Sequence, residues 1–205
     1  MRTFYRFCLL AQIFLVSIPS LAQKTTSQIS NRLKTLDSAL TKLHERAMFN
    51  GVVLVAEQGK IRYKKALGVA NSETSEPLTT SSAFNLASVS KQFIAMMIMQ
   101  LQERGKLMYD ESVQTYLPDF PYSGISVRDL LNHTSGLPEY FDLAQKYLGP
   151  LDTLTNDGLV QLLHHYQPPL LFQPGDRWEY CNTGYVLLGA IVTKVSGMPI
   201  ENFFN

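Results

Sequence analysis

The sequence predicts an α+β fold, in which an amphipathic helix and a β-hairpin precede a long helical section. Three patterns support this: a helical spacing of apolar residues over 29–48, β-branched runs over 52–64, and an apolar segment within 84–105. The chain has 205 residues, is 45% hydrophobic and carries a formal net charge of +1. This composition is typical of one globular domain with a sizeable core. It contains no basic stripe of the kind that binds nucleic acid.

Residues 1–22 have the features of a secretory signal peptide. Two arginines precede an apolar run over 7–16, and the small-x-small pattern Ser-Leu-Ala follows over 20–22. The apolar run is short for a bilayer span, so an uncleaved membrane anchor is the alternative. We therefore expect a secreted or periplasmic protein with a mature domain over 23–205, no membrane span and a near-neutral charge. Cleavage leaves Cys181 as the single cysteine, which excludes an intrachain disulfide.

The first part of the mature chain reads as a helix followed by a hairpin. Leucines and other apolar residues recur every three or four positions over 29–48, and Gly51 ends the pattern. Val52–Ala56 and Ile61–Lys64 are strand-like and flank a turn at 58–60. Two strands are too few for an independently stable sheet, so we expect this hairpin to need further strands.

The remaining elements are predicted to be mostly helical. After a polar loop over 71–82, a helix within 84–105 contains a wholly apolar run over 93–99, which predicts burial on all sides. A capping-box pattern, Ser126-Val-Arg-Asp129, opens a short helix. Further helices are expected over 154–166, from Asn182 or Thr183 to Gly197, and from Ile200 to the last residue.

Ser88 and Lys91 lie at the start of the apolar helix and are the first candidate catalytic pair. A helical backbone places side chains three residues apart on one face, within contact distance. A serine hydroxyl becomes a good nucleophile only when a neighbouring group takes its proton, and a desolvated lysine is one such group. The helix start also supplies free N–H groups near a developing oxyanion. A single Ser-x-x-Lys pattern nevertheless arises by chance about as often as not.

Tyr180 and Asn182 form a second candidate pair at a turn between an extended segment and a helix. A phenol beside a cation can relay protons, and an amide can orient a substrate carbonyl or a lysine. The alternatives at this stage are a buried tyrosine and a helix-capping asparagine.

The sequence contains three longer motifs, and the four candidate residues fall within the first and the third. The motifs are Phe-Asn-Leu-Ala-Ser-Val-Ser-Lys-Gln-Phe over 84–93, His-Thr-Ser-Gly-Leu over 133–137, and Pro-Gly-Asp-Arg-Trp-Glu-Tyr-Cys-Asn-Thr-Gly-Tyr-Val-Leu-Leu-Gly over 174–189. In order and spacing they closely resemble the class C β-lactamases and penicillin-binding-protein-like serine hydrolases, over essentially all of 29–205. The resemblance implies a β-lactamase/transpeptidase-like fold, an antiparallel sheet flanked by helices with a helical subdomain.

Roles follow from this resemblance position by position. It makes Ser88 the acylated nucleophile, Lys91 its proton partner, Tyr180 the general base and Asn182 a substrate-orienting amide. It also implies that the Ser88 N–H forms part of the oxyanion hole.

The sequence departs from the family pattern in two places. Cys181 stands where the family usually has serine, which we expect to be tolerated because that side chain is not catalytic. The third motif, Lys-Thr-Gly or His-x-Gly on a later strand, is absent. We therefore expect the chain to be truncated before the C-terminal strands, which would also complete the sheet around the hairpin.

No metal or cofactor is expected. His44, His133, His164 and His165 lack the spacing of metal ligands, and we expect solvent-exposed, capping or loop-fixing roles for them. A packed, inert thiol is the favoured interpretation of Cys181.

The leading hypothesis is an exported serine hydrolase that forms an acyl-enzyme on Ser88 and acts on D-amino peptides, β-lactams or small esters. Of these substrates, a cell-wall D-Ala peptide or a small ester is preferred to a dedicated antibiotic-destroying role. The alternative is a non-catalytic truncated fragment or a binding-only relative, which the missing third motif favours. The partner is a small-molecule or peptidoglycan-like substrate, and the sequence sets no oligomeric state.

Overall fold

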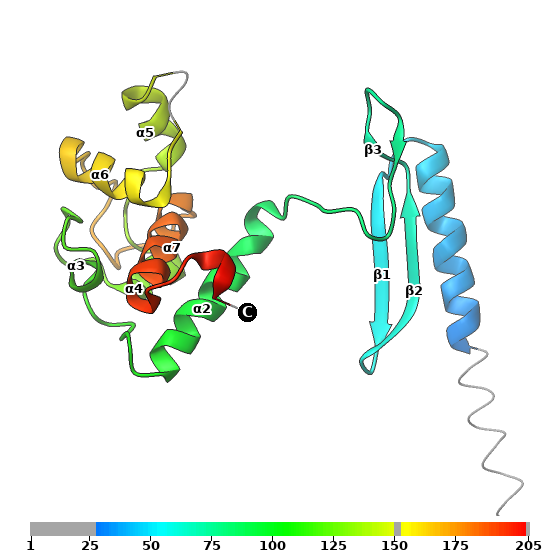
Figure 1. Cartoon of the computed structure of the whole chain (residues 1–205), viewed down its shortest axis with the longest axis horizontal. Coiled ribbons are helices and arrows are strands. Elements are labelled where there is room, and N and C mark those ends of the chain that lie inside the picture. The colour runs from blue at the N-terminus through cyan, green and yellow to red at the C-terminus, as the bar shows by residue number, and fades with distance from the viewer. Residues whose placement is uncertain (1–27, 150–152, 204–205) are drawn as a thin grey trace, which may run out of the picture. The chain divides into compact units, whose positions relative to one another are not determined.

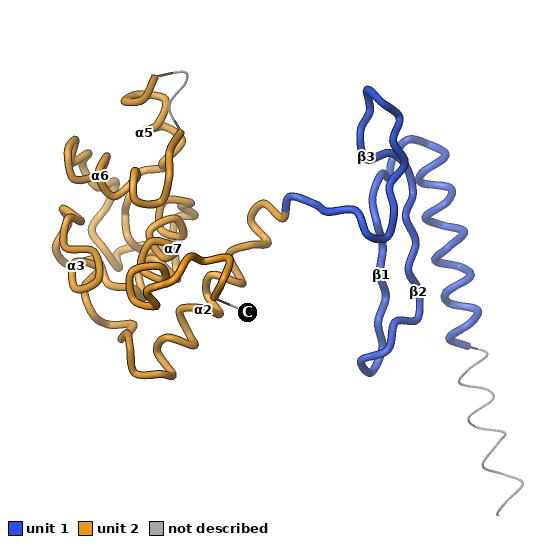
Figure 2. Tube along the Cα trace, in the orientation of Figure 1, with its two compact units in different colours: residues 1–85 blue, residues 86–205 orange. Residues whose placement is uncertain are grey.

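The computed structural model describes residues 28–149 and 153–203, and its elements are shown in Figure 1. The predicted signal peptide, 1–22, lies outside these described residues. The chain divides into two compact units, residues 1–85 and 86–205 (Figure 2). The first unit combines a helix with strands and the second is helical, so the predicted α+β class is confirmed.

The first unit contains the predicted helix and hairpin. Residues 28–45 are helical, and strands β1 (Gly51–Glu57) and β2 (Lys60–Leu67) pair antiparallel with Gly51 opposite Leu67. Gln58 and Gly59 join the strands with φ of 50° and 73°, as a tight hairpin turn requires. In the described part of the chain no third strand joins this sheet.

A second, smaller hairpin occupies the segment that the sequence predicted to be a polar loop. Strands β3 (Val69–Asn71) and β4 (Glu76–Pro77) pair antiparallel. The Asn50 side chain holds this hairpin, because its amide donates to the Val69 carbonyl at 3.0 Å and its oxygen accepts from the Val69 N–H at 2.7 Å. Strands this short carry too few alternating residues to be recognised by periodicity.

Polar contacts attach the helix over 28–45 to the main hairpin. The Asp37 carboxylate accepts from Lys65 Nζ at 2.7 Å and from the Tyr63 hydroxyl at 2.8 Å. Lys65 and Tyr63 together hold the pKa of Asp37 below its ordinary value. Among the described residues of this unit, Leu40 is the buried apolar side chain. The helix is therefore attached to the hairpin largely by polar contacts.

The second unit is built around helix α7 (Asn182–Ser196), which packs against α2 (Ser90–Glu103), α4 (Val127–Asn132) and α6 (Asn156–Tyr166). Its remaining elements are short, and are the 3₁₀ turn η1 (Ala87–Val89), α3 (Val113–Tyr116), α5 (Tyr140–Tyr147) and the 3₁₀ turn η2 (Ile200–Asn202). The sequence patterns predicted neither α3 nor α5. The helix expected from Ile200 onward is described only as this 3₁₀ turn.

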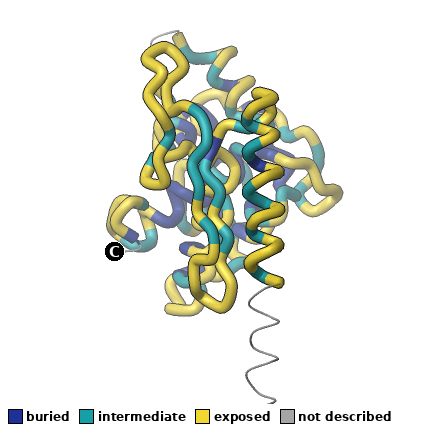
Figure 3. The backbone as a smooth tube through the Cα atoms, turned by 90° about the vertical axis from the view of Figure 1, so that its right-hand side faces the viewer, coloured by how far each residue is buried: buried dark blue, intermediate teal, exposed yellow. Residues whose placement is uncertain are grey.

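The hydrophobic core belongs to the second unit. Residues 187–192 of α7 are all buried, and Ile98, Leu101, Leu130 and Leu163 from its neighbouring helices are at most 1% exposed. Buried residues, dark blue in Figure 3, are concentrated in this unit, whereas the hairpin strands are half-buried or exposed.

The apolar run of α2 is not buried on all sides, contrary to the sequence prediction. Met97 and Ile98 are buried, but Phe93, Met96 and Met99 remain 44–47% exposed. Among the described residues, α2 packs mainly against α7, and a helix cannot bury its whole circumference against a single layer.

A tight loop over 133–139 connects α4 to α5. The predicted capping box of Ser126 and Asp129 opens α4, and His133 ends it in the left-handed conformation, with φ of 59°. Gly136 has φ of 72°, and a Cβ at this position would lie 2.1 Å from the Phe172 carbonyl oxygen. The Gly136 carbonyl accepts from the Leu171 N–H at 2.8 Å, so two segments touch here through their backbones.

We expect Gly136→Ala to destabilise the full-length protein strongly. Gly124→Ala is the matched control, because Gly124 also has a left-handed φ of 85° but nothing lies within 4 Å of its Cβ position. The control should cost roughly 1–2 kcal/mol from backbone strain alone. Gly136→Ala should cost on the order of 4 kcal/mol, because strain and backbone overlap add. Urea unfolding measures the loss of stability in each variant. Equal losses would contradict the prediction, because they would show that the Phe172 carbonyl moves away from the added Cβ.

Candidate active site

The four predicted site residues lie together within the helical unit. Ser88 Oγ is 2.7 Å from the Tyr180 hydroxyl oxygen. Lys91 Nζ donates to Ser88 Oγ at 3.1 Å and to Asn182 Oδ1 at 2.6 Å. One hydroxyl therefore contacts both an ammonium and a phenol.

The start of α2 positions Ser88 and Lys91. Ser88 lies in the 3₁₀ turn η1 that leads into α2, and the preceding residue, Ala87, has a left-handed φ of 45°. Lys91 follows one turn later, so its ammonium reaches the serine as the spacing predicted. Left-handed backbone at a non-glycine residue is strained, and such strain gathers at functional sites.

The start of α7 positions Tyr180 and Asn182, and both alternatives raised by the sequence are wrong. Tyr180 is 44% exposed rather than buried. Cys181, not Asn182, is the N-cap residue of α7, and its side chain makes no capping hydrogen bond. The Asn182 side chain points instead to Lys91 and to Glu139.

The groups around Tyr180 favour its ionised form. The Lys91 ammonium and then the Ser88 hydroxyl hold the pKa of Tyr180 below its ordinary value, because both favour the phenolate. Lys91 Nζ also lies 5.0 Å from the centre of the Tyr180 ring and 5.6 Å from that of Tyr185. A phenolate at this position can accept the Ser88 proton directly, across 2.7 Å.

His133 supports the second pair from the loop over 133–139. Its Nδ1 lies 3.2 Å from both the backbone N and the carbonyl O of Cys181, and its ring centre lies 4.7 Å from that of Tyr180. Burial lowers the pKa of His133, which favours the neutral ring. The predicted loop-fixing role of His133 agrees with these contacts.

The other histidines and Cys181 contribute structure. His44 and His164 each contact a backbone carbonyl, that of Phe49 at 3.0 Å and that of Asp119 at 2.9 Å. The Cys181 thiol is buried and donates to the Leu137 carbonyl at 3.3 Å. Burial raises the pKa of this thiol, as expected for a packed rather than a reactive cysteine.

Glu139 is the site residue that sequence reasoning missed. Its Oε2 accepts from the backbone N–H of Asn182 at 2.9 Å and from the side-chain amide of Asn182 at 3.0 Å. It lies two residues beyond the His-Thr-Ser-Gly-Leu motif, and only the fold shows that this loop runs beside the start of α7. No spacing rule in the sequence links positions 139 and 182.

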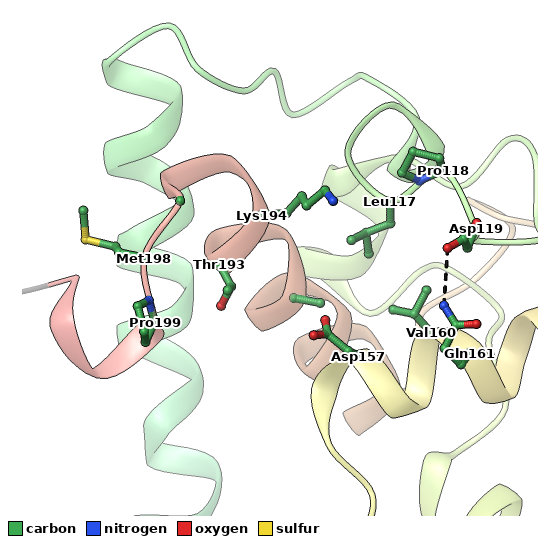
Figure 4. Close-up of a pocket in the computed structure, with 12 residues that line it drawn as sticks. Leu117, Pro118, Asp119, Asp157, Val160, Gln161, Thr193, Lys194, Met198 and Pro199 are labelled. Carbon is green, nitrogen blue, oxygen red and sulfur yellow. Dashed lines mark hydrogen bonds between the residues drawn. The ribbon is translucent and has the colours of Figure 1, made fainter.

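A pocket of about 420 Å³ opens beside the four residues, between α2, α5, α6 and α7. Apolar and aromatic side chains form much of its lining, including Ile94, Tyr140, Phe141 and Tyr185. A second hollow, of about 570 Å³, lies at the opposite end of α7 around Asp157 and Lys194 (Figure 4). It contains none of the predicted site residues, so the pocket beside Ser88 is the candidate substrate site.

Within residues 28–149 and 153–203, no helix combines the length and apolarity needed to cross a bilayer. The same described residues hold no group of three or more His, Cys, Asp or Glu side chains placed to bind a metal ion.

Comparison with known proteins gives the family. The family model described as "Beta-lactamase" matches residues 36–205. Penicillin-binding protein 4* of Bacillus subtilis is 42% identical over 173 residues, which are 84% of this chain and 38% of that protein. Esterase EstB of Burkholderia gladioli is 33% identical over 174 residues, which are 77% of this chain and 44% of the esterase.

A solved structure supports the same family assignment. The crystal structure of a penicillin-binding protein from Bacillus halodurans superposes with a TM-score of 0.70 at 33% identity, covering 80% of this chain and 50% of that one. The chain therefore belongs to the β-lactamase family of serine hydrolases, as its motifs predicted. It spans less than half the length of the two curated relatives.

We expect Tyr180 to ionise below the ordinary tyrosine value of about 10. The absorbance difference at 295 nm between the wild-type protein and Tyr180→Phe isolates its titration from those of the other tyrosines. Lys91→Ala should move this transition to higher pH, because the ammonium that favours the phenolate is removed. A transition at or above the ordinary value in the wild type would contradict the proposed tuning.

Proposed function

We propose that this protein is an exported serine hydrolase that forms an acyl-enzyme on Ser88. One observation carries the proposal: Ser88 Oγ lies within hydrogen-bond distance of both the Lys91 ammonium and a phenol of lowered pKa. A nucleophile, a base and a group that tunes the base are thereby in contact, which is the arrangement that nucleophilic catalysis needs.

In this mechanism, the Tyr180 phenolate takes the Ser88 proton while Ser88 Oγ attacks the substrate carbonyl carbon. Tyr180 then returns the proton to the leaving group as the tetrahedral intermediate collapses to an acyl-enzyme. A water molecule repeats the sequence and releases the acid, which regenerates the free serine. Lys91 stabilises the phenolate throughout, and Asn182 orients Lys91 and the substrate. The backbone N–H of Ser88, which the family pattern makes part of the oxyanion hole, stabilises the oxyanion.

The substrates in this proposal are D-amino peptides, β-lactams or small esters, with a cell-wall D-Ala peptide or a small ester preferred. The relatives support this range, since one is named a penicillin-binding protein and another an esterase. The apolar and aromatic lining of the pocket suits an uncharged acyl group of moderate size. The proposal of export is supported by the signal-peptide features of residues 1–22, which are typical of a protein whose mature domain, 23–205, is periplasmic or secreted.

A binding-only relative or a non-catalytic fragment is the second candidate. Residues 183–205 contain no Lys-Thr-Gly or His-x-Gly motif, and a protein without that motif at any later position would be such a relative. Without a second oxyanion donor, the rate of acyl transfer would fall on the order of 10²–10³-fold.

Labelling with a fluorophosphonate separates the two candidates. We expect intact-mass spectrometry of the protein from its native source to show one covalent adduct, mapped to Ser88. Ser88→Ala should abolish the adduct. Tyr180→Phe should slow its formation on the order of 10²–10⁴-fold, because the general base is removed. Ser196→Ala is the matched control, since its hydroxyl bonds the Met198 backbone at the other end of α7. An unlabelled wild-type protein would favour the non-catalytic candidate.

The preferred substrate class has its own test. We expect the full-length protein to hydrolyse a p-nitrophenyl ester or a D-Ala-D-Ala peptide faster than the chromogenic cephalosporin nitrocefin, with Ser88→Ala as the background. Nitrocefin turnover well above that background and faster than both other substrates would identify a β-lactamase instead.

A further inference from the structure

We propose that Glu139 is a positioning residue that fixes the side-chain amide of Asn182 so that its oxygen faces Lys91. This inference rests on the proposed function, because it concerns the orientation of a residue of the same site. Glu139 is half-buried and lies at the start of α5, where its Oε1 accepts from the Tyr140 N–H at 3.1 Å. Its other oxygen, Oε2, takes both hydrogen bonds from Asn182.

The two ends of the Asn182 amide have chemically opposite partners. A carboxylate only accepts hydrogen bonds, so the NH₂ group must face Glu139. An ammonium only donates, so the Oδ1 atom must face Lys91. Rotating the amide by 180° would set acceptor against acceptor and donor against donor. Glu139 and Lys91 together therefore fix one orientation of the Asn182 amide. Either residue alone would disfavour the rotated amide less strongly.

The surrounding backbone keeps Glu139 in this position. The Thr183 hydroxyl donates to the Pro138 carbonyl at 2.7 Å, and the Cys181 thiol donates to the Leu137 carbonyl at 3.3 Å. Residues 137–139 thus run alongside 181–183, with one contact at each step. Because Thr183 is fully buried, this pairing lies within the packed part of the unit and supports Glu139 beside Asn182.

Glu139 also acts on the base through its charge. Among the described residues, the groups that act on Tyr180 or lie against its ring are Lys91 of α2, Ser88 of η1, His133 at the end of α4, Glu139 at the start of α5 and Tyr185 of α7. The Glu139 carboxylate raises the pKa of Tyr180, in opposition to Lys91 and Ser88. Its two effects separate by substitution, since glutamine keeps an acceptor for Asn182 but no charge, whereas alanine keeps neither.

The experiment compares Glu139→Gln, Glu139→Ala and the control Asp142→Asn in the full-length protein. Asp142 is an exposed carboxylate in the first turn of the same helix. The readout is the rate of Ser88 labelling by the fluorophosphonate across pH, with thermal unfolding recorded for each variant.

We expect Glu139→Ala to slow labelling at the pH plateau on the order of 10–100-fold, as loss of an orienting neighbour does at other sites. Glu139→Gln should stay near the wild-type plateau rate. Its acid limb should move to lower pH, because loss of the negative charge lowers the pKa of Tyr180. Asp142→Asn should match the wild type in both respects. The inference would be overturned if the Glu139→Ala variant folds, is labelled at the wild-type rate and keeps the acid limb of its pH–rate profile at the wild-type position.

A second measurement tests the contact between Glu139 and Asn182 without any labelling of Ser88. A failure of Ser88 to be labelled would count against the proposed function alone. In protein labelled with ¹⁵N-asparagine, the side-chain amide signal of Asn182 is identified by its loss in Asn182→Ser. This signal should shift in Glu139→Gln and Glu139→Ala but not in Asp142→Asn. An unmoved signal in Glu139→Ala would exclude the contact on which the inference depends.

Discussion

The packing of α2 against α7 is the constraint on which the candidate site depends. Ser88 and Lys91 belong to the start of one helix, and Tyr180 and Asn182 to the start of the other. Buried residues such as Ile98 and Leu188 fill the interface between these helices and their neighbours. Because protein interiors are close-packed, a shift of either helix would displace one pair from the other. The 2.7 Å contact between Ser88 and Tyr180 is thus set by core packing away from the site.

The loop over 133–139 is the second support, and it works through polar contacts. The His133 ring lies against Tyr180 and the Cys181 backbone, and Glu139 binds Asn182. The same loop exchanges backbone hydrogen bonds with the segment before Tyr180, where the Glu179 N–H donates to the His133 carbonyl at 2.9 Å. Both sides of the Tyr-Cys-Asn segment are therefore held by one loop. The bend of this loop is at a glycine with a left-handed backbone, Gly136.

The two units differ in how they are stabilised. The helical unit has a continuous apolar core around α7, whereas the described residues of the helix-and-hairpin unit, 28–85, have Leu40 as their single buried leucine and a polar cluster at Asp37. A sheet of two strands buries little apolar surface. The candidate site residues all come from the better-packed unit, which suits side chains that must hold a fixed geometry.

The sequence by itself determined the fold class, the main helix and hairpin, and the four residues of the candidate site. Local rules were sufficient for the helix, the hairpin and the contact between Ser88 and Lys91, whereas Tyr180 and Asn182 were predicted only through the family resemblance of the longer motifs. The exposure of Phe93, Met96 and Met99 and the short elements α3, α5 and β3 were decided by tertiary structure. So was the contact between Glu139 and Asn182, since it joins residues 43 positions apart. Periodicity records which side chains are apolar, but only the packed chain decides which face finds a partner.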